Sequence, residues 1–162
     1  SRNGENKNVT LTPRRDDKSG RWLVGIVLKQ DFDLPFEATY NLDGVGGPSA
    51  GLMLTLGTID KLTEQSLLAP EGAGNEDSAR SYVAGTGTID ASGKVGAIGG
   101  IEHKVKSAED LGAEVFLAPA DNCKEAIKNH PKDMTVLKVT SLEDAIHQLD
   151  AYNRGDGYTT CG

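Results

Sequence analysis

The sequence predicts a mixed α/β (α+β) domain in which helices pack on a mixed sheet. Short apolar runs rich in β-branched residues recur along the chain; strands dominate its first part, and helices alternate with strands in its second. The 162 residues suit one domain with a substantial core. The proportions of hydrophobic residues (37%) and charged residues (25%) are typical of a soluble globular protein.

The composition disfavours several classes of protein. A net charge of −7 disfavours a general nucleic-acid binder, which needs a basic face. No apolar run reaches about 18 residues, so we predict no membrane span, and no signal-peptide pattern stands at Ser1. The sequence has no Gly-x-x-x-x-Gly-Lys-Ser/Thr loop and therefore no predicted ATPase of its own. Because the chain opens without Met, we expect it to be a piece of a longer protein.

Three short strands are predicted in the first part of the chain, over 9–13, 22–28 and 36–42. A charged turn over 14–20 separates the first two strands. The third leads into a glycine-rich stretch and then into an apolar run that predicts a buried helix ending near 61–63. The polar residues 64–81 predict a surface loop.

The second part is predicted to alternate between strands and helices. Strands over 82–89 and 94–98 are joined by a hairpin turn at 90–93. A helix over 101–111 opens with Gly99-Gly100 and ends before Gly112; its apolar face is Ile101, Val105, Ala108 and Leu111. A strand over 115–119 is followed by a helix that Asp121 or Asn122 caps and that reaches about 129. A strand over 135–139 comes next, and then a helix over 141–149 with Glu143 or Asp144 in its first turn. The chain ends in a polar tail from 151.

Ser49 is a candidate nucleophile because it lies where a glycine-rich turn meets a helix. Pro48 suits the first turn of that helix, where a missing N–H costs little. Free backbone N–H groups and the positive end of the helix dipole can stabilise an oxyanion there, and the N–H groups of Gly47 and Ser49 are the candidates. From this stretch alone, a simple helix-capping serine is the competing interpretation.

A nucleophilic serine needs a base, and the sequence offers three histidines and one well-placed lysine. His130 and His147 lie in polar or amphipathic surroundings that predict surface positions, and His103 points about 100° away from its neighbour Lys104. Lys104 follows a Gly-Gly helix entry and borders an apolar face. A lysine in water is a poor base, but burial can make it neutral. Lys104 is therefore the preferred base, against the alternative of a solvated lysine.

The two cysteines, Cys123 and Cys161, do not form a Cys-x-x-Cys pair, so a zinc or redox site is not expected. Their spacing leaves one disulfide and two free thiols as equal alternatives. No metal site and no cofactor is predicted.

Three segments in order resemble the proteolytic domain of the Lon protease family. They are Gly47-Pro48-Ser49-Ala50-Gly51, Ala84-Gly85-Thr86-Gly87 and Gly99-Gly100-Ile101-Glu102-His103-Lys104. The resemblance covers about residues 36–150 and implies the Lon proteolytic fold. It implies a Ser49–Lys104 catalytic dyad in which the Thr86 hydroxyl supports the lysine amine.

The chain differs from ATP-dependent Lon proteases. It has no ATPase module, carries Gly46 where an acidic residue is frequent, and has a longer gap over 64–81. The longer motif at 43–53 and Ala120-Asp121-Asn122-Cys123 resemble bacterial Lon-like proteases that contain a PDZ domain. That resemblance implies an extracytoplasmic, membrane-anchored full-length protein, anchored through a segment absent from this chain, and favours a Cys123–Cys161 disulfide.

The resemblance implies three parts to the chain. Residues 1–18 are expected to be the end of a PDZ-like domain or a linker, 19–150 the proteolytic domain, and 151–162 a C-terminal tail.

The expected function is ATP-independent hydrolysis of peptide bonds in protein or peptide substrates. An extended substrate is expected to add as a strand along Leu42, Asp43, Gly44 and Val45, and a hexameric ring is implied by resemblance. Two alternatives stay open: a catalytically inactive Lon-like fold that acts as a binding module, and a phosphate-binding domain like those of small-molecule kinases.

Overall fold

The computed structural model describes residues 8–24, 39–40, 47–63, 67, 82–129 and 131–162. The chain divides into two compact units, residues 1–39 and 40–162. Among the described residues, no helix is long and apolar enough to cross a membrane.

The first unit contains an antiparallel hairpin of β1 (Arg14–Arg15) and β2 (Trp22–Leu23). The prediction of a strand over 9–13 is wrong, because the first strand begins only at Arg14. The turn explains the shift. Asp16 accepts hydrogen bonds from the backbone N–H and hydroxyl of Ser19, and Gly20 takes a positive φ of 68°, so the strands pair on either side of 16–20.

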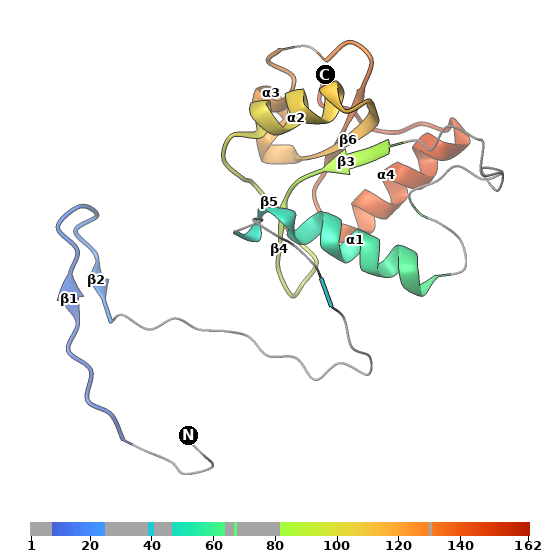
Figure 1. Ribbon diagram of the computed structural model, residues 1–162. Coiled ribbons are helices and arrows are strands. Elements are labelled where there is room, and N and C mark those ends of the chain that lie inside the picture. The colour runs from blue at the N-terminus through green and yellow to red at the C-terminus, as the bar shows by residue number, and fades with distance from the viewer. Residues whose placement is uncertain (1–7, 25–38, 41–46, 64–66, 68–81, 130) are drawn as a thin grey trace. The chain divides into compact units, whose positions relative to one another are not determined.

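The second unit is built on three parallel strands in the order β3 (Tyr82–Gly85), β6 (Ala113–Pro119) and β7 (Thr135–Val139). The crossover from β3 to β6 contains α2 (Ile101–Asp110), and the crossover from β6 to β7 contains α3 (Cys123–Ala126). The other two helices are α1 (Gly51–Leu62) and α4 (Leu142–Arg154). Figure 1 shows α2 and α3 on one side of the strands, with α1 and α4 on the other.

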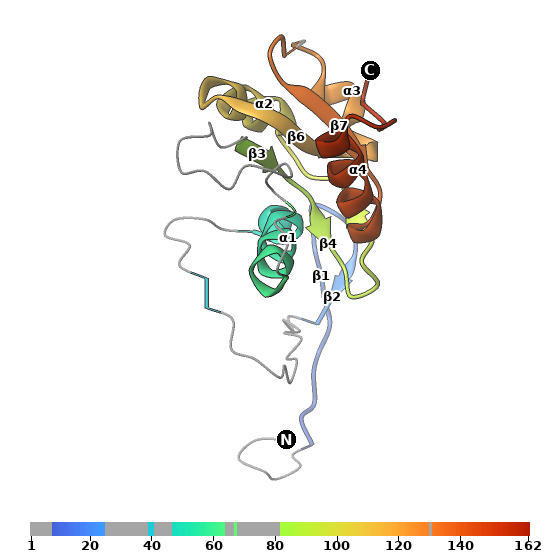
Figure 2. The ribbon, with the colours of Figure 1, turned by 90° about the vertical axis from the view of Figure 1, so that its right-hand side faces the viewer.

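Alternating side chains of β6 and β7 form two separate cores. Phe116, Ala118 and Val136 pack with α2 and α3, whereas Val115, Leu117 and Leu137 pack with α1 and α4. Successive residues of a strand point to opposite faces, so this pattern places the sheet between two helical layers, as the turned view in Figure 2 also shows. The predicted α/β class is thereby confirmed. The described sheet is parallel, and antiparallel strand pairing is found in the hairpins.

The local predictions fit well in several places. The helix α1 ends at Leu62 and β7 covers 135–139, as expected. The capped start of α4 is also confirmed, because the Ser141 hydroxyl accepts a hydrogen bond from the Asp144 N–H at 3.1 Å. The single strand predicted over 82–89 divides at 86–87 into β3 of the parallel sheet and β4 (Thr88–Ile89), which forms a hairpin with β5 (Val95–Gly96) where a longer strand over 94–98 is predicted.

Three predictions at helix ends are wrong. The short helix α3 ends at Ala126, three residues before its expected end at about 129. Leu111 is 80% exposed instead of buried, because α2 ends at Asp110 and Leu111 leaves the helical conformation. The last helix, α4, continues to Arg154, five residues past its expected end at 149, and stops at Gly155 with φ of 70°.

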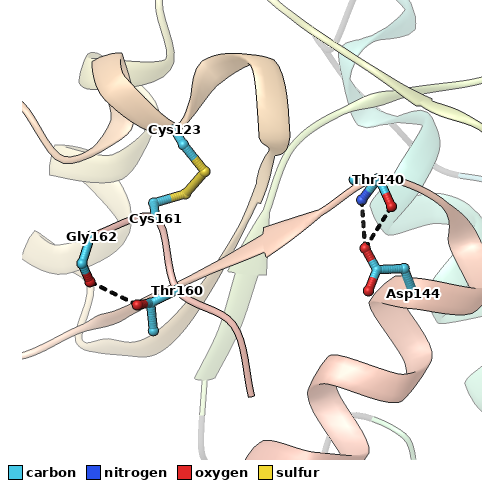
Figure 3. Close-up of a disulfide and its surroundings, with 6 residues drawn as sticks. All are labelled: Cys123, Thr140, Asp144, Thr160, Cys161 and Gly162. Atoms are coloured by element: carbon cyan, nitrogen blue, oxygen red, sulfur yellow. Dashed lines mark hydrogen bonds between the residues drawn. A yellow bond between two sulfur atoms is a disulfide. The ribbon is translucent and has the colours of Figure 1, made fainter. Parts of the chain in front are cut away.

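The C-terminal residues are packed on the unit. The carbonyl of Thr159 accepts a hydrogen bond from Lys138 N–H, and Cys161 N–H donates to the carbonyl of Val136, both at 3.0 Å. A disulfide joins Cys123 to Cys161, as Figure 3 shows. The end of the chain therefore forms an additional antiparallel bridge to β7, at Leu137, and is tied covalently to the start of α3.

Candidate active site

Ser49 lies in a short 3-10 helix, Pro48–Ala50, that leads directly into α1. Gly47, before this turn, has φ of 90°, a conformation that favours glycine, and Pro48 occupies the first helical position. Ser49 is half-buried. The local sequence therefore places its hydroxyl at the N-terminal end of a helix, as predicted.

The backbone of Ser49 is fixed to the residues that follow β3. Its carbonyl accepts two hydrogen bonds, from the N–H of Gly87 at 2.9 Å and from the hydroxyl of Thr86 at 3.0 Å. The N–H of Leu52 donates back to the Gly87 carbonyl at 3.1 Å. Thr86 is only 2% exposed, so these bonds are sheltered from water. They fix the start of α1 to the carboxyl end of β3.

Lys104 lies near the start of α2 on the other face of the sheet. Lys104 is exposed, so the part of the chain that the structure describes does not bury it as we expected. Lys104 borders a cavity of about 380 Å³ whose described lining also includes Ala84, Gly85, His103, Ser107, Ala108, Leu111 and Phe116.

Gly85 is next to both halves of the candidate site. Its backbone lines the Lys104 cavity, and a Cβ at this position would lie 2.7 Å from Met53 Sδ of α1 and 2.9 Å from Leu117 Cβ. Only glycine permits this close approach. The structure thus brings Thr86 to Ser49 and Gly85 to Lys104, but no hydrogen bond among the described residues joins Lys104 to Ser49 or to Thr86.

Asn122 is a further residue of the site region whose role the sequence did not reveal. It was predicted as a helix cap, yet its side chain makes no capping bond to α3. The buried amide bonds instead to both backbone groups of Ile98, two residues before the start of the Gly100–Lys104 segment. No local signal could have shown this, because the partner lies 24 positions away in the sequence.

The remaining predicted residues have different outcomes. His147 is exposed, as expected, and the 86% exposed side chain of His103 lies 3.9 Å from Glu102. His130 lies outside the described residues, as do all four expected substrate-strand residues, Leu42, Asp43, Gly44 and Val45. Within the part of the chain that the structure describes, no group of three or more His, Cys, Asp or Glu residues could hold a metal ion.

Comparison with known proteins supplies the family. The model of the Lon protease (S16) C-terminal proteolytic domain matches residues 43–150. The Lon protease of Phenylobacterium zucineum is 32% identical over 114 residues, which are 68% of this chain and 13% of that protein. The Lon protease of Cytophaga hutchinsonii is 28% identical over 114 residues, 70% of this chain and 12% of that protein. For the Lon protease of Buchnera aphidicola the identity is 28% over 103 residues, 62% of this chain and 12% of that protein. These matches therefore span only about an eighth of each curated relative.

Proposed function

This chain belongs to the Lon protease (S16) C-terminal proteolytic domain family, and on that premise we propose that it is an ATP-independent serine endopeptidase with a Ser49–Lys104 dyad. Its substrates are proteins or peptides. The observation that carries the proposal is the double hydrogen bond from Thr86 and Gly87 to the Ser49 carbonyl. It fixes a serine at a helix N-terminus beside the strand end that also borders the cavity of Lys104.

The placement of Ser49 supports its role as nucleophile. Backbone N–H groups at the start of a helix are available for a developing negative charge, and the helix dipole favours that charge. We assign the oxyanion site to the N–H groups of Gly47 and Ser49. The hydrogen bonds to its carbonyl fix the Ser49 backbone, so the position of the backbone that carries the nucleophile is set before substrate binds.

The proposed reaction begins when neutral Lys104 takes the proton from the Ser49 hydroxyl. The serine oxygen attacks the peptide carbonyl, the C–N bond breaks, and protonated Lys104 returns its proton to the departing amine. Neutral Lys104 next accepts a proton from water, which attacks the acyl-enzyme. The bond from the acyl carbon to the Ser49 oxygen then breaks, and protonated Lys104 returns its proton to that oxygen, which restores the serine hydroxyl and neutral Lys104.

Thr86 supports Lys104 in this scheme. Its hydroxyl donates its proton to the Ser49 carbonyl, which leaves its lone pairs free to accept a hydrogen bond from the lysine amine. The exposed position of Lys104 suggests that bound substrate or a neighbouring subunit completes the site. We propose a ring-forming homo-oligomer, by resemblance to the family, as that neighbour.

We further propose that the full-length protein is a PDZ-containing, membrane-anchored bacterial protease whose proteolytic domain lies outside the cytoplasm. The Cys123–Cys161 bond supports this placement, because disulfides persist in oxidising compartments and are rare in the cytosol.

The test is hydrolysis of casein without ATP by the wild-type chain, Ser49→Ala, Lys104→Ala and the double variant. Each single change should reduce the rate by about 10³-fold or more, and the double change should be little worse, because the two groups act as one unit. His103→Ala is the matched control, since His103 lines the same cavity and should be dispensable. Undiminished hydrolysis by Ser49→Ala would exclude the proposed chemistry, and folded wild-type protein that shows no hydrolysis would favour an inactive binding fold.

A further inference from the structure

We propose that Asn122 is a positioning residue that fixes the entry of α2 and, through it, the direction of Lys104. The inference rests on the proposed role of Lys104 as the general base. It assigns a function to the buried amide of Asn122. This residue follows β6 in the sequence, whereas α2, the helix that carries Lys104, precedes β6.

The contacts of Asn122 use its whole amide group. Its Oδ1 accepts a hydrogen bond from the Ile98 N–H at 2.8 Å, and its Nδ2 donates to the Ile98 carbonyl at 3.0 Å. The same nitrogen lies 3.3 Å from Glu125 Oε2. Asn122 is only 6% exposed, so loss of the bond between its Oδ1 and the Ile98 N–H would leave a buried acceptor without a partner. One side chain thus binds both backbone groups of a single residue, as a neighbouring strand would.

Ile98 is the last residue before the two glycines that open α2. Gly100 has φ of 68°, and α2 has no side-chain cap at its N-terminus. Glycines lose the most conformational freedom on folding, so this entry is the least restrained point between β5 and Lys104. Fixing Ile98 from both sides limits where the first turn of α2 begins and in which direction Lys104 points.

Asn122 is itself firmly anchored. It ends the 3-10 helix Ala120–Asn122, and the next residue, Cys123, carries the disulfide to Cys161. Cys161 and Thr159 form backbone hydrogen bonds with β7, so the disulfide connects the segment of Asn122 to the sheet. In Figure 3 this disulfide links α3 to the end of the chain.

The chain offers a matched control in Gln148 on α4. This amide is also buried, at 7% exposure. Its Oε1 accepts a hydrogen bond from the Thr159 N–H at 2.6 Å, and its Nε2 donates to Asp144 Oδ1 at 3.1 Å. Asn122→Asp and Gln148→Glu each replace one buried, hydrogen-bonded amide by a carboxylate of nearly the same shape. Only the first touches the Lys104 segment.

The experiment measures phosphonylation of Ser49 by a peptidyl diphenyl phosphonate, in which the serine oxygen bonds to phosphorus and phenol leaves, in these two variants and the wild-type chain. Both variants should lose unfolding free energy. Only Asn122→Asp should lower the maximal inactivation rate, by about 10-fold or more, with the probe dissociation constant within about 3-fold, because misplacement of a base affects the chemical step. Amide hydrogen exchange over residues 98–104 should quicken in that variant alone. Equal inactivation rates in Asn122→Asp and Gln148→Glu would overturn the inference.

Two provisions keep the test decisive. If Asn122→Asp does not fold, Asn122→Ser and Gln148→Ser remove the same bonds without burying a charge. If the folded wild-type chain is not labelled at Ser49, the proposed function fails. The exchange of residues 98–104 then still decides whether Asn122 fixes the entry of α2.

Discussion

The segments that carry Ser49 and Lys104 are supported in different ways. Ser49 is fixed by hydrogen bonds from residues just past β3, and its helix packs through Leu52 and Leu56, both fully buried, on one face of the sheet. Lys104 is exposed on the opposite layer. The entry to its helix is fixed from Asn122, next to a disulfide.

The difference indicates that the two halves of the proposed dyad have separate supports that can be changed one at a time. They meet at the end of β3, where Thr86 bonds to the Ser49 carbonyl and Gly85 lines the cavity of Lys104. A change near Cys123 should therefore affect mainly the lysine half, and a change at Thr86 mainly the serine half.

The largest effect on stability is expected from loss of the disulfide on the lysine side. Cys123→Ala combined with Cys161→Ala opens a loop with a sequence separation of 38 residues. Chain entropy then predicts a loss of about 3–4 kcal/mol in the free energy of unfolding, measured by urea denaturation. Hydrogen exchange should rise more in α2 and α3 than in α1. A loss below about 1 kcal/mol, or two alkylatable thiols in the native wild-type chain, would contradict this prediction.

A smaller effect, confined to the serine side, is expected for Thr86→Val. The Ser49 carbonyl keeps its hydrogen bond from Gly87, so the unfolding free energy should change by no more than about 1 kcal/mol. The rate of Ser49 phosphonylation by the phosphonate probe should fall by about 10-fold, which corresponds to about 1.4 kcal/mol in the barrier. Thr135→Val, at a half-buried threonine of β7, is the control and should keep the wild-type rate. An unchanged rate in Thr86→Val would remove Thr86 from the site.

The smallest effect is expected at Asp144, which lies on the same face of the sheet as α1 but belongs to the cap of α4. Figure 3 shows its Oδ2 accepting hydrogen bonds from the Thr140 N–H at 2.8 Å and the Thr140 hydroxyl at 2.7 Å. Burial opposes its charge, but the bonds from Thr140 and Gln148 outweigh this and lower the pKa of Asp144 below its ordinary value.

A carboxylate with a lowered pKa stabilises the fold at neutral pH and loses that contribution as the pH falls through its folded pKa. Asp144→Asn should therefore cost about 1 kcal/mol at pH 7, measured by urea denaturation, and the difference from wild type should disappear as the pH falls through the lowered pKa of Asp144. Phosphonylation of Ser49 by the probe should be unaffected. If the difference in unfolding free energy between wild type and Asp144→Asn instead grew at acid pH, the assigned direction of the pKa shift would be wrong.

The sequence alone predicts the elements whose determinants are local. Pro48 and the apolar run after it place α1, and Ser141 with Asp144 places the start of α4. Much of what the sequence does not predict depends on contacts between residues that lie far apart in the sequence. Asn122 matches a helix cap locally, but its partner Ile98 is brought to it by the fold. The helical period places Leu111 on the buried face, yet α2 ends one residue earlier.

The candidate site follows the same rule. Motifs single out Ser49, Thr86 and Lys104, and the structure connects Thr86 to Ser49. The exposure of Lys104 matches the alternative of a solvated lysine, and the sequence could not decide between the two because the periodicity of α2 places the lysine at the edge of an apolar face without fixing what covers it.

The pH dependence of Ser49 phosphonylation by the phosphonate probe, in the wild-type chain and in Lys104→Ala, tests the central claim most directly. A lysine base acts only when neutral, so the wild-type rate should keep rising through neutrality into the mildly alkaline range, and Lys104→Ala should lose this rise. A histidine base would instead level off near its usual value of about 6.5. A plateau reached by about pH 7 and unchanged in Lys104→Ala would contradict the assignment of Lys104 as the base.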